Sequence, residues 1–173
     1  GGVGKTPTSV NLAASLQATK RRVLLIDLDP QGNATMGSGI NKADLERSIY
    51  EVLMQECSAA EAILETPGGF QILPANGDLT AAEIALLNAD NREMRLREII
   101  QTIAADYDYV VIDCPPSLNM LTINALVAAN GVIIPMQCEY YALEGLSALV
   151  ETISAISSTL NPQLQIEGIL RTM

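Results

Sequence analysis

The chain has 173 residues, of which 49% are hydrophobic, and a formal net charge of −10 with no histidine. This length suits one globular domain with a substantial core. The acidity excludes a grip on nucleic acid that uses the whole surface, and it leaves only a local basic patch for such contacts. The absence of histidine removes the commonest general base and metal ligand.

Cysteine usage and hydropathy predict a cytoplasmic protein. Cys57, Cys114 and Cys138 lie far apart and form no CxxC pair, so we expect buried, reduced thiols. No apolar run reaches the roughly 18 residues that a membrane span requires, and no signal peptide precedes the first motif.

The chain opens with a glycine-rich run that ends in Gly-Lys-Thr, residues 1–6. Glycines let the backbone curl so that its N–H groups point into one concavity, as in a phosphate-binding P-loop. Such a loop places Lys5 at the β- and γ-phosphates and the Thr6 hydroxyl on Mg²⁺. The full pattern needs a glycine before residue 1, so a plain glycine turn before a helix remains the alternative. Because the chain lacks an initiator methionine and begins inside this motif, we expect a fragment.

Apolar spacing predicts the elements that follow. A helix is expected from Lys5 to about Thr19, since Pro7 in its first turn is tolerated there. The next strand, Val23 to Ile26, reads as buried on both faces, which is typical of a parallel sheet. Later elements are expected, in order, as helices at 45–55 and 58–65, a strand at 70–73, helices at 79–88 (with Asp78 as N-cap) and 92–105, a buried strand at 109–112, a helix at 118–129, a strand at 132–135, an amphipathic helix at 142–160 with Leu143 and Leu160 among its apolar positions, and a strand at 165–170. This alternation predicts an α/β fold, a doubly wound, mostly parallel sheet with helices on both faces, in a single domain over residues 1–173.

Two of the predicted strands end in aspartates. In an open parallel sheet, ligands gather outside the carboxyl ends of the strands, so these loops should converge with the P-loop. Asp113 follows an apolar strand in the Walker B layout and is expected to serve the Mg²⁺ shell. Asp29 could orient the attacking water, while Asp27 lies closer to the strand and is expected to act behind it. The alternative for each is a solvated cap or turn residue.

Four stretches together resemble the ParA/Soj chromosome and plasmid partition ATPases, which are deviant Walker A (SIMIBI-class) P-loop NTPases. They are the opening glycine run, Leu-Leu-Ile-Asp-Leu-Asp-Pro-Gln-Gly-Asn-Ala-Thr, Val-Val-Ile-Asp-Cys-Pro-Pro-Ser-Leu, and Ile-Ile-Pro-Met-Gln-Cys-Glu-Tyr-Tyr-Ala-Leu-Glu-Gly. The likeness covers essentially the whole chain.

The resemblance implies ATP and Mg²⁺ as cofactors, with Thr6 and Asp113 serving the metal and with Asp29 and Lys5 as catalytic residues. It also implies two switch segments, residues 29–35 and 113–118. The nucleotide-binding residues would be Gly1, Gly2, Val3, Gly4, Lys5, Thr6 and Pro7. Partners would be a second copy in an ATP-dependent homodimer, non-specific DNA, and a ParB-type centromere-binding protein that stimulates hydrolysis. The expected location is cytoplasmic and nucleoid-associated.

Several departures from the family pattern matter. The family's signature lysine, first strand and C-terminal part, including its adenine-recognition and DNA-contacting residues, fall outside residues 1–173. Loss of that lysine should impair hydrolysis more than binding, since it acts like an arginine finger. Where the family usually has Thr, Pro7 offers no N–H to the α-phosphate, so we expect weakened ATP binding. A missing strand in the central sheet should leave an unpaired ladder.

Other functions remain open. A MinD-like division-site ATPase would use a C-terminal membrane helix, and a nitrogenase iron-protein-like reductase would need cluster cysteines. A non-hydrolysing, ATP-dependent dimerisation switch is the third alternative, against which the presence of Asp29 argues. Residues 137–139, Gln-Cys-Glu, could touch nucleotide or partner, or could simply form a polar approach to the next helix.

Overall fold

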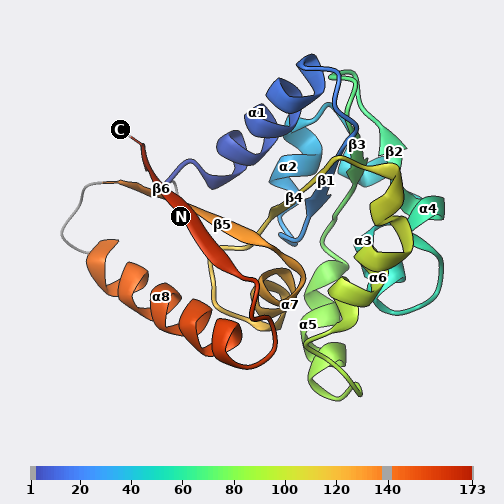
Figure 1. Cartoon of the computed structure of the whole chain (residues 1–173). Coiled ribbons are helices and arrows are strands. Elements are labelled where there is room, and N and C mark those ends of the chain that lie inside the picture. The colour runs from blue at the N-terminus through green and yellow to red at the C-terminus, as the bar shows by residue number, and fades with distance from the viewer. Residues whose placement is uncertain (1–2, 138–141, 173) are drawn as a thin grey trace.

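The computed structural model describes residues 3–137 and 142–172, and its elements alternate as predicted (Figure 1). The helices are α1 (Lys5–Ala18), α2 (Asn33–Gly37), α3 (Ile49–Leu53), α4 (Ala59–Ala62), α5 (Leu79–Leu87), α6 (Arg95–Ile103), α7 (Met120–Ala128) and α8 (Ala142–Ser158), with 3₁₀ turns η1 (Lys42–Asp44) and η2 (Ala104–Asp106). The strands are β1 (Val23–Asp27), β2 (Leu64–Glu65), β3 (Gln71–Leu73), β4 (Tyr109–Asp113), β5 (Gly131–Gln137) and β6 (Gln165–Thr172).

The strands form two sheets. The larger has the order β2-β3-β1-β4, in which β1 runs parallel to both β3 and β4 while β2 is antiparallel to β3. The smaller joins β5 and β6 in parallel, with a register shift between Val132 and Ile133. Within the described ranges β4 pairs only with β1, and β5 only with β6. The predicted mostly parallel α/β architecture is confirmed, although it is divided between two sheets.

Helices cover both faces of the larger sheet (Figure 1). This arrangement explains why the sequence of β1 is apolar over Val23 to Ile26. Leu24 and Ile26 belong to the large core that packs against α3, α5, α6 and α7. Val23 and Leu25 point to the opposite face and belong to the core beneath α1 and α2. Successive strand residues point to opposite faces, so a strand covered on both sides needs apolar side chains throughout. A third core joins α7, α8 and β5 with Leu164, the residue before β6.

One expectation for the middle of the chain is wrong, and another is confirmed only in part. The helix expected over 58–65 ends at Ala62, and residues 64–65 form β2. A helix pattern this short is weak, and pairing with β3 decides the structure of its last residues. Asp78 stands at the N-cap position of α5, but its side chain makes no capping hydrogen bond. Its N–H instead donates to Oδ1 of Asn76 at 3.1 Å, so that asparagine organises the turn.

The burial expected near the two ends of α8 and along β4 is also partly wrong. Leu143 and Leu160, expected on the apolar face, are 59% and 39% exposed. On that face only Ile153 and Ile156, in the C-terminal half of α8, are buried, because the small sheet beneath α8 has just two strands. Tyr109, at the start of β4, is 47% exposed for a similar reason, since β4 has a neighbour on one side only.

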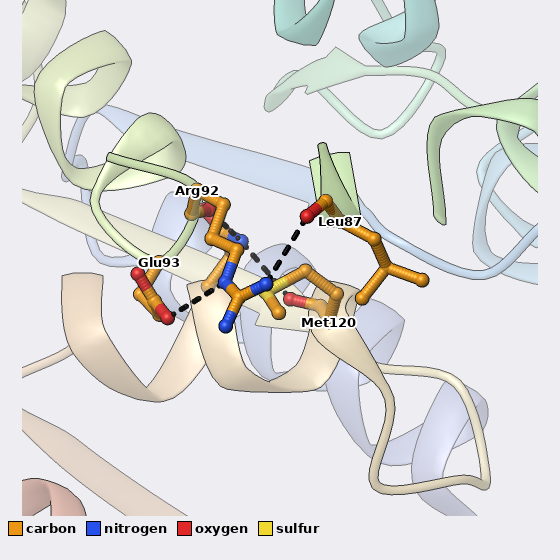
Figure 2. A network of polar contacts seen from close by, with 5 residues as sticks. Leu87, Arg92, Glu93 and Met120 are labelled. Carbon is orange, nitrogen blue, oxygen red and sulfur yellow. Dashed lines mark hydrogen bonds and ion pairs between the residues drawn. The ribbon is translucent and has the colours of Figure 1, made fainter. Parts of the chain in front are cut away.

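A polar network ties the α5–α6 connection to α7 (Figure 2). The Arg92 guanidinium donates to the Leu87 carbonyl at 3.1 Å and pairs with Glu93 at 3.0 Å. The buried Asn124 amide donates to the carbonyls of Arg92 at 2.8 Å and of Met120 at 3.0 Å. These contacts join the α5–α6 connection to the first turn of α7. The Thr122 hydroxyl on α7 in turn donates to the carbonyl of Ser117, in the loop that follows β4, at 2.6 Å. Among the described helices, none is long and apolar enough to cross a membrane.

Candidate functional site

The three loops expected to converge do meet at one edge of the larger sheet. Asp27 and Asp113 are paired in register at the ends of β1 and β4. The Leu28 N–H donates to the Asp113 carbonyl at 2.8 Å, which holds the two strand ends together. The first turn of α1 reaches the same edge, because the Thr6 hydroxyl donates to Oδ2 of Asp113 at 2.9 Å.

The Asp113 side chain faces α1 and is almost completely buried, with 1% of its surface exposed. Besides Thr6, the Ser9 hydroxyl donates to its Oδ1 at 2.8 Å. Burial raises the pKa of Asp113, while the hydrogen bonds from Ser9 and Thr6 and the nearby charge of Lys5 lower it. The sequence analysis missed Ser9, although a residue three positions after Thr6 on a helix faces the same side.

The predicted phosphate loop is described from Val3 onward, so the predicted residues Gly1 and Gly2 lie outside the described residues. Gly4 has φ 80°, a left-handed conformation that favours glycine, and it is the N-cap of α1. The Thr172 hydroxyl, at the end of β6, donates to the Val3 carbonyl at 2.8 Å. The end of β6, in the small sheet, is therefore hydrogen-bonded to this loop. No local sequence pattern indicated that contact.

Lys5 and Pro7 occupy the first turn of α1, where N–H groups have no helical partner. Lys5 is half-buried and Pro7 is exposed. A cavity of about 470 Å³ adjoins this turn and is lined by Thr6, Pro7, Val10, Asn11, Asn33 and Gly37. A larger hollow of about 610 Å³ lies at the other end of β1, around Arg21 and Tyr107, away from the three loops.

At the end of β1 and in the loop after it, the carboxylates of Asp27 and Asp29 accept hydrogen bonds from the backbone of the same segment. Asp29 is 8% exposed, and its Oδ1 accepts a hydrogen bond from the Gln31 N–H at 2.9 Å. Its Oδ2 accepts none from a described residue. Asp27 is fully buried and accepts from the Asp29 N–H at 3.0 Å and from the Thr35 hydroxyl at 2.7 Å. Asp27 therefore contacts the backbone of Asp29 and the side chain of Thr35.

The two aspartates after β1 differ in environment. Burial raises the pKa of Asp27 from its ordinary value of 3.8 to about 6, although hydrogen bonds from Thr35 and Asp29 lower it. Asp113 is a nearby like charge that adds to the rise. Thr35, which takes part in this network, lies at the end of the switch segment 29–35 that the resemblance implied, but no role of its own was predicted for it.

Cys57 and Cys114 belong to no candidate metal-binding group in the described part of the chain. Cys57 and Cys114 are free, as expected, but the expectation that they are buried is wrong, since both are only half-buried. Burial raises the pKa of the Cys114 thiol to about 12, so the thiol stays protonated at neutral pH. Residues 3–137 and 142–172 contain no group of three or more metal-ligating Cys, Asp or Glu side chains. Cys138 and Glu139 lie outside the described residues. Whether the Gln-Cys-Glu stretch touches nucleotide or partner therefore stays a prediction.

The donor set at the converging loops fits a hard cation with phosphate ligands. Mg²⁺ prefers oxygen donors and is usually held by one or two protein side chains together with substrate phosphates and water. The Thr6 hydroxyl and the Asp113 carboxylate are such donors, 2.9 Å apart. The N-terminus of the 14-residue helix α1 supplies free N–H groups and the positive end of its dipole to an anion beside them. Fold and site together define an α/β P-loop protein.

Comparisons with known proteins agree with this class. The family described as an AAA domain (AAA_31) matches residues 1–166. The chromosome partitioning protein ParA of Myxococcus xanthus is 55% identical over 174 residues, which cover all of this chain and 62% of that protein. The sporulation initiation inhibitor protein Soj of Bacillus subtilis is 51% identical over all of this chain and 69% of its own length.

A solved structure gives the same fold. Cobyrinic acid a,c-diamide synthase from Mycobacterium smegmatis, with a bound ATP analogue and magnesium, has a TM-score of 0.96 at 43% identity, covering 99% of this chain and 70% of that one. The chain belongs to the AAA domain family, and its named relatives include the ParA/Soj chromosome partitioning proteins. It spans about two thirds of the length of these curated relatives.

Proposed function

We propose that this chain is the ATPase domain, over residues 1–173, of a ParA/Soj-type partition protein. It binds ATP with Mg²⁺, hydrolyses ATP to ADP and phosphate, and dimerises with ATP bound. The dimer binds DNA non-specifically, and a ParB-type partner stimulates hydrolysis, so that plasmid or chromosome DNA is segregated. The observation that carries the proposal is the hydrogen bond between Thr6 and Asp113, which joins the phosphate loop to the Walker B strand beside the Asp29 loop.

Each residue has a proposed role. Gly1 to Thr6 hold the nucleotide phosphates through backbone N–H groups, Pro7 adjoins the nucleotide without an N–H to donate, and Lys5 adds a positive charge at the β- and γ-phosphates. Thr6 and Asp113 hold Mg²⁺, which when bound neutralises charge on the β- and γ-phosphate oxygens. The Asp29 carboxylate accepts a hydrogen bond from water and orients its oxygen toward the γ-phosphorus, as the bond from that phosphorus to the ADP oxygen breaks.

Two names among the matches point to different outputs. ParA and Soj are partition proteins by name, whereas the solved structure is named a cobyrinic acid a,c-diamide synthase. Partition is favoured because the relatives named for it are 51–55% identical and the synthase is 43% identical. A MinD-like positioning ATPase and a non-hydrolysing dimerisation switch are the alternatives within the superfamily.

The test is steady-state ATP turnover by the full gene product, measured alone, with DNA, with the cognate ParB-type protein, and with both. Partition predicts that DNA and partner together stimulate turnover most. Binding and dimerisation without turnover would indicate the switch, and stimulation by anionic lipid vesicles without DNA would indicate the MinD-like function. Turnover that requires cobyrinic acid and an amide-nitrogen donor would support the synthase.

A further inference from the structure

Thr35, on α2, is fully buried and joins three segments of the chain. Its hydroxyl donates to Oδ2 of Asp27 at 2.7 Å and accepts from the Ala75 N–H at 2.9 Å. Its own N–H donates to the same carboxylate oxygen at 2.8 Å. One side chain therefore connects the end of β1, the start of α2 and the segment that follows β3.

The Asp27 carboxylate carries this connection to Asp29. One of its oxygens accepts both hydrogen bonds from Thr35, and the other accepts the Asp29 N–H at 3.0 Å. Because the two oxygens belong to one rigid planar group, a shift of the Thr35 contact also moves the acceptor of the Asp29 N–H. The backbone of Asp29 is thus held through a fully buried carboxylate that Thr35 orients.

The same two segments meet a second time at Gly32. Its N–H donates to the Asp29 carbonyl at 2.8 Å, which closes the turn after Asp29. Gly32 has φ 63°, and a Cβ placed on it would lie 2.8 Å from the Ala75 carbonyl oxygen. The turn therefore packs directly on the backbone at Ala75, and the Thr35 hydroxyl is the hydrogen-bonded link beside that contact.

We propose that Thr35 is a positioning residue for ATP hydrolysis, whose hydroxyl fixes the Asp29 loop against the segment after β3. The inference rests on the proposed function, because that function assigns Asp29 to the attacking water. A loop held at two places presents its carboxylate in one geometry, and small displacements of a catalytic group cost large factors in rate.

The kinetic test compares Thr35→Val, which keeps the shape of the side chain but removes the hydroxyl, with Thr35→Ser, which keeps the hydroxyl. In the full gene product, Thr35→Val should lower kcat about tenfold to a hundredfold while KM for ATP changes by less than about threefold. Thr35→Ser should keep most of the wild-type kcat. Thr66→Val is the matched control, since it removes another buried threonine hydroxyl, bonded to the Phe70 carbonyl at 2.6 Å, away from the site.

Amide hydrogen exchange tests the same link without any activity. Thr35→Val should speed exchange at both Ala75 and Asp29 by at least about tenfold, and should leave the amide of Ile153 in α8 unchanged. Faster exchange at Ala75 alone, or equal kcat in all four proteins, would overturn the proposal. If the wild type shows no turnover, the proposed function fails, and the exchange at Asp29 still decides whether Thr35 holds that loop. If the Thr35→Val protein does not fold, Thr35→Ser is the variant to measure. Its amide exchange rate at Asp29 should then equal that of the wild type.

Discussion

The Thr6 hydroxyl donates a hydrogen bond of 2.9 Å to Oδ2 of Asp113, although the two residues are 107 positions apart in the chain. This contact joins the first turn of α1 to the end of β4. If both groups serve one Mg²⁺ ion, the affinity for nucleotide should depend on that ion through them.

The first prediction concerns Thr6. Thr6→Val should remove most of the dependence of ATP-analogue affinity on Mg²⁺, about tenfold or more, because a charge-assisted contact is lost. Thr6→Ser should keep that dependence. Calorimetric titrations with and without Mg²⁺ measure both, and Thr19→Val, at the far end of the same helix, is the control. An unchanged Mg²⁺ dependence in Thr6→Val would remove this residue from the metal site.

Pro7 carries the second prediction. Because proline lacks an N–H group, Pro7→Thr should restore a hydrogen bond to the α-phosphate and strengthen ATP binding by roughly 1.5–3 kcal/mol, about tenfold to a hundredfold. The exposed Pro162→Thr should have no effect on affinity. Equal affinities of the wild type and Pro7→Thr would refute the argument.

A third prediction concerns the turn after Asp29. Gly32→Ala forces an alanine into φ 63° with its Cβ 2.8 Å from the Ala75 carbonyl oxygen, and should lower the free energy of unfolding by about 1–3 kcal/mol. Gly77→Ala is the matched control, since nothing lies within 4 Å of a Cβ there. Urea unfolding compares the two, and equal stabilities would mean that this turn relaxes without cost.

Asp27 gives a prediction on pH. Burial raises its pKa from 3.8 to about 6 in the folded protein, so the folded state binds a proton more tightly than the unfolded state. This group's contribution to the free energy of unfolding is therefore largest below its ordinary pKa and is lost as the pH rises through about 6. From about pH 5 to about pH 7.5 the loss should be about 1.4 kcal/mol.

The comparison that isolates Asp27 is the difference in unfolding free energy between the wild type and Asp27→Asn at those two pH values. The asparagine does not titrate, so the wild type should lose stability relative to the variant as the pH rises. A difference that stays constant, or that grows in favour of the wild type, would show that Asp27 is ionised throughout.

Much of the fold could be predicted because local signals agreed with the final packing. The run Val23 to Ile26 is apolar at every position, as a strand covered on both faces requires. Residues 64–65 were misassigned because their strand exists only through pairing with β3, which is not encoded locally. Leu143 and Leu160 were expected to be buried because helical spacing defines a face but not the extent of the surface that covers it.

In the candidate site, too, residues that local patterns specify could be predicted, and residues that act through long-range contacts could not. Thr6 and Asp113 could be brought together in advance, because a motif and a strand end imply where each must lie. Thr35 and Thr172 could not, since both act through hydrogen bonds to segments that meet them only after folding. Ser9 lies between these cases, because its spacing from Thr6 was visible but its partner was not.

The most direct test of the account is the rate of phosphate release from ATP by the full gene product, compared with its Asp29→Ala variant in the presence of Mg²⁺, DNA and partner. The account predicts that Asp29→Ala lowers the rate by at least about a hundredfold while the affinity for an ATP analogue stays within about threefold. The exposed Asp90→Ala should hydrolyse ATP like the wild type. An Asp29→Ala protein that hydrolyses ATP at the wild-type rate would contradict the assignment of the three converging loops to one hydrolytic site.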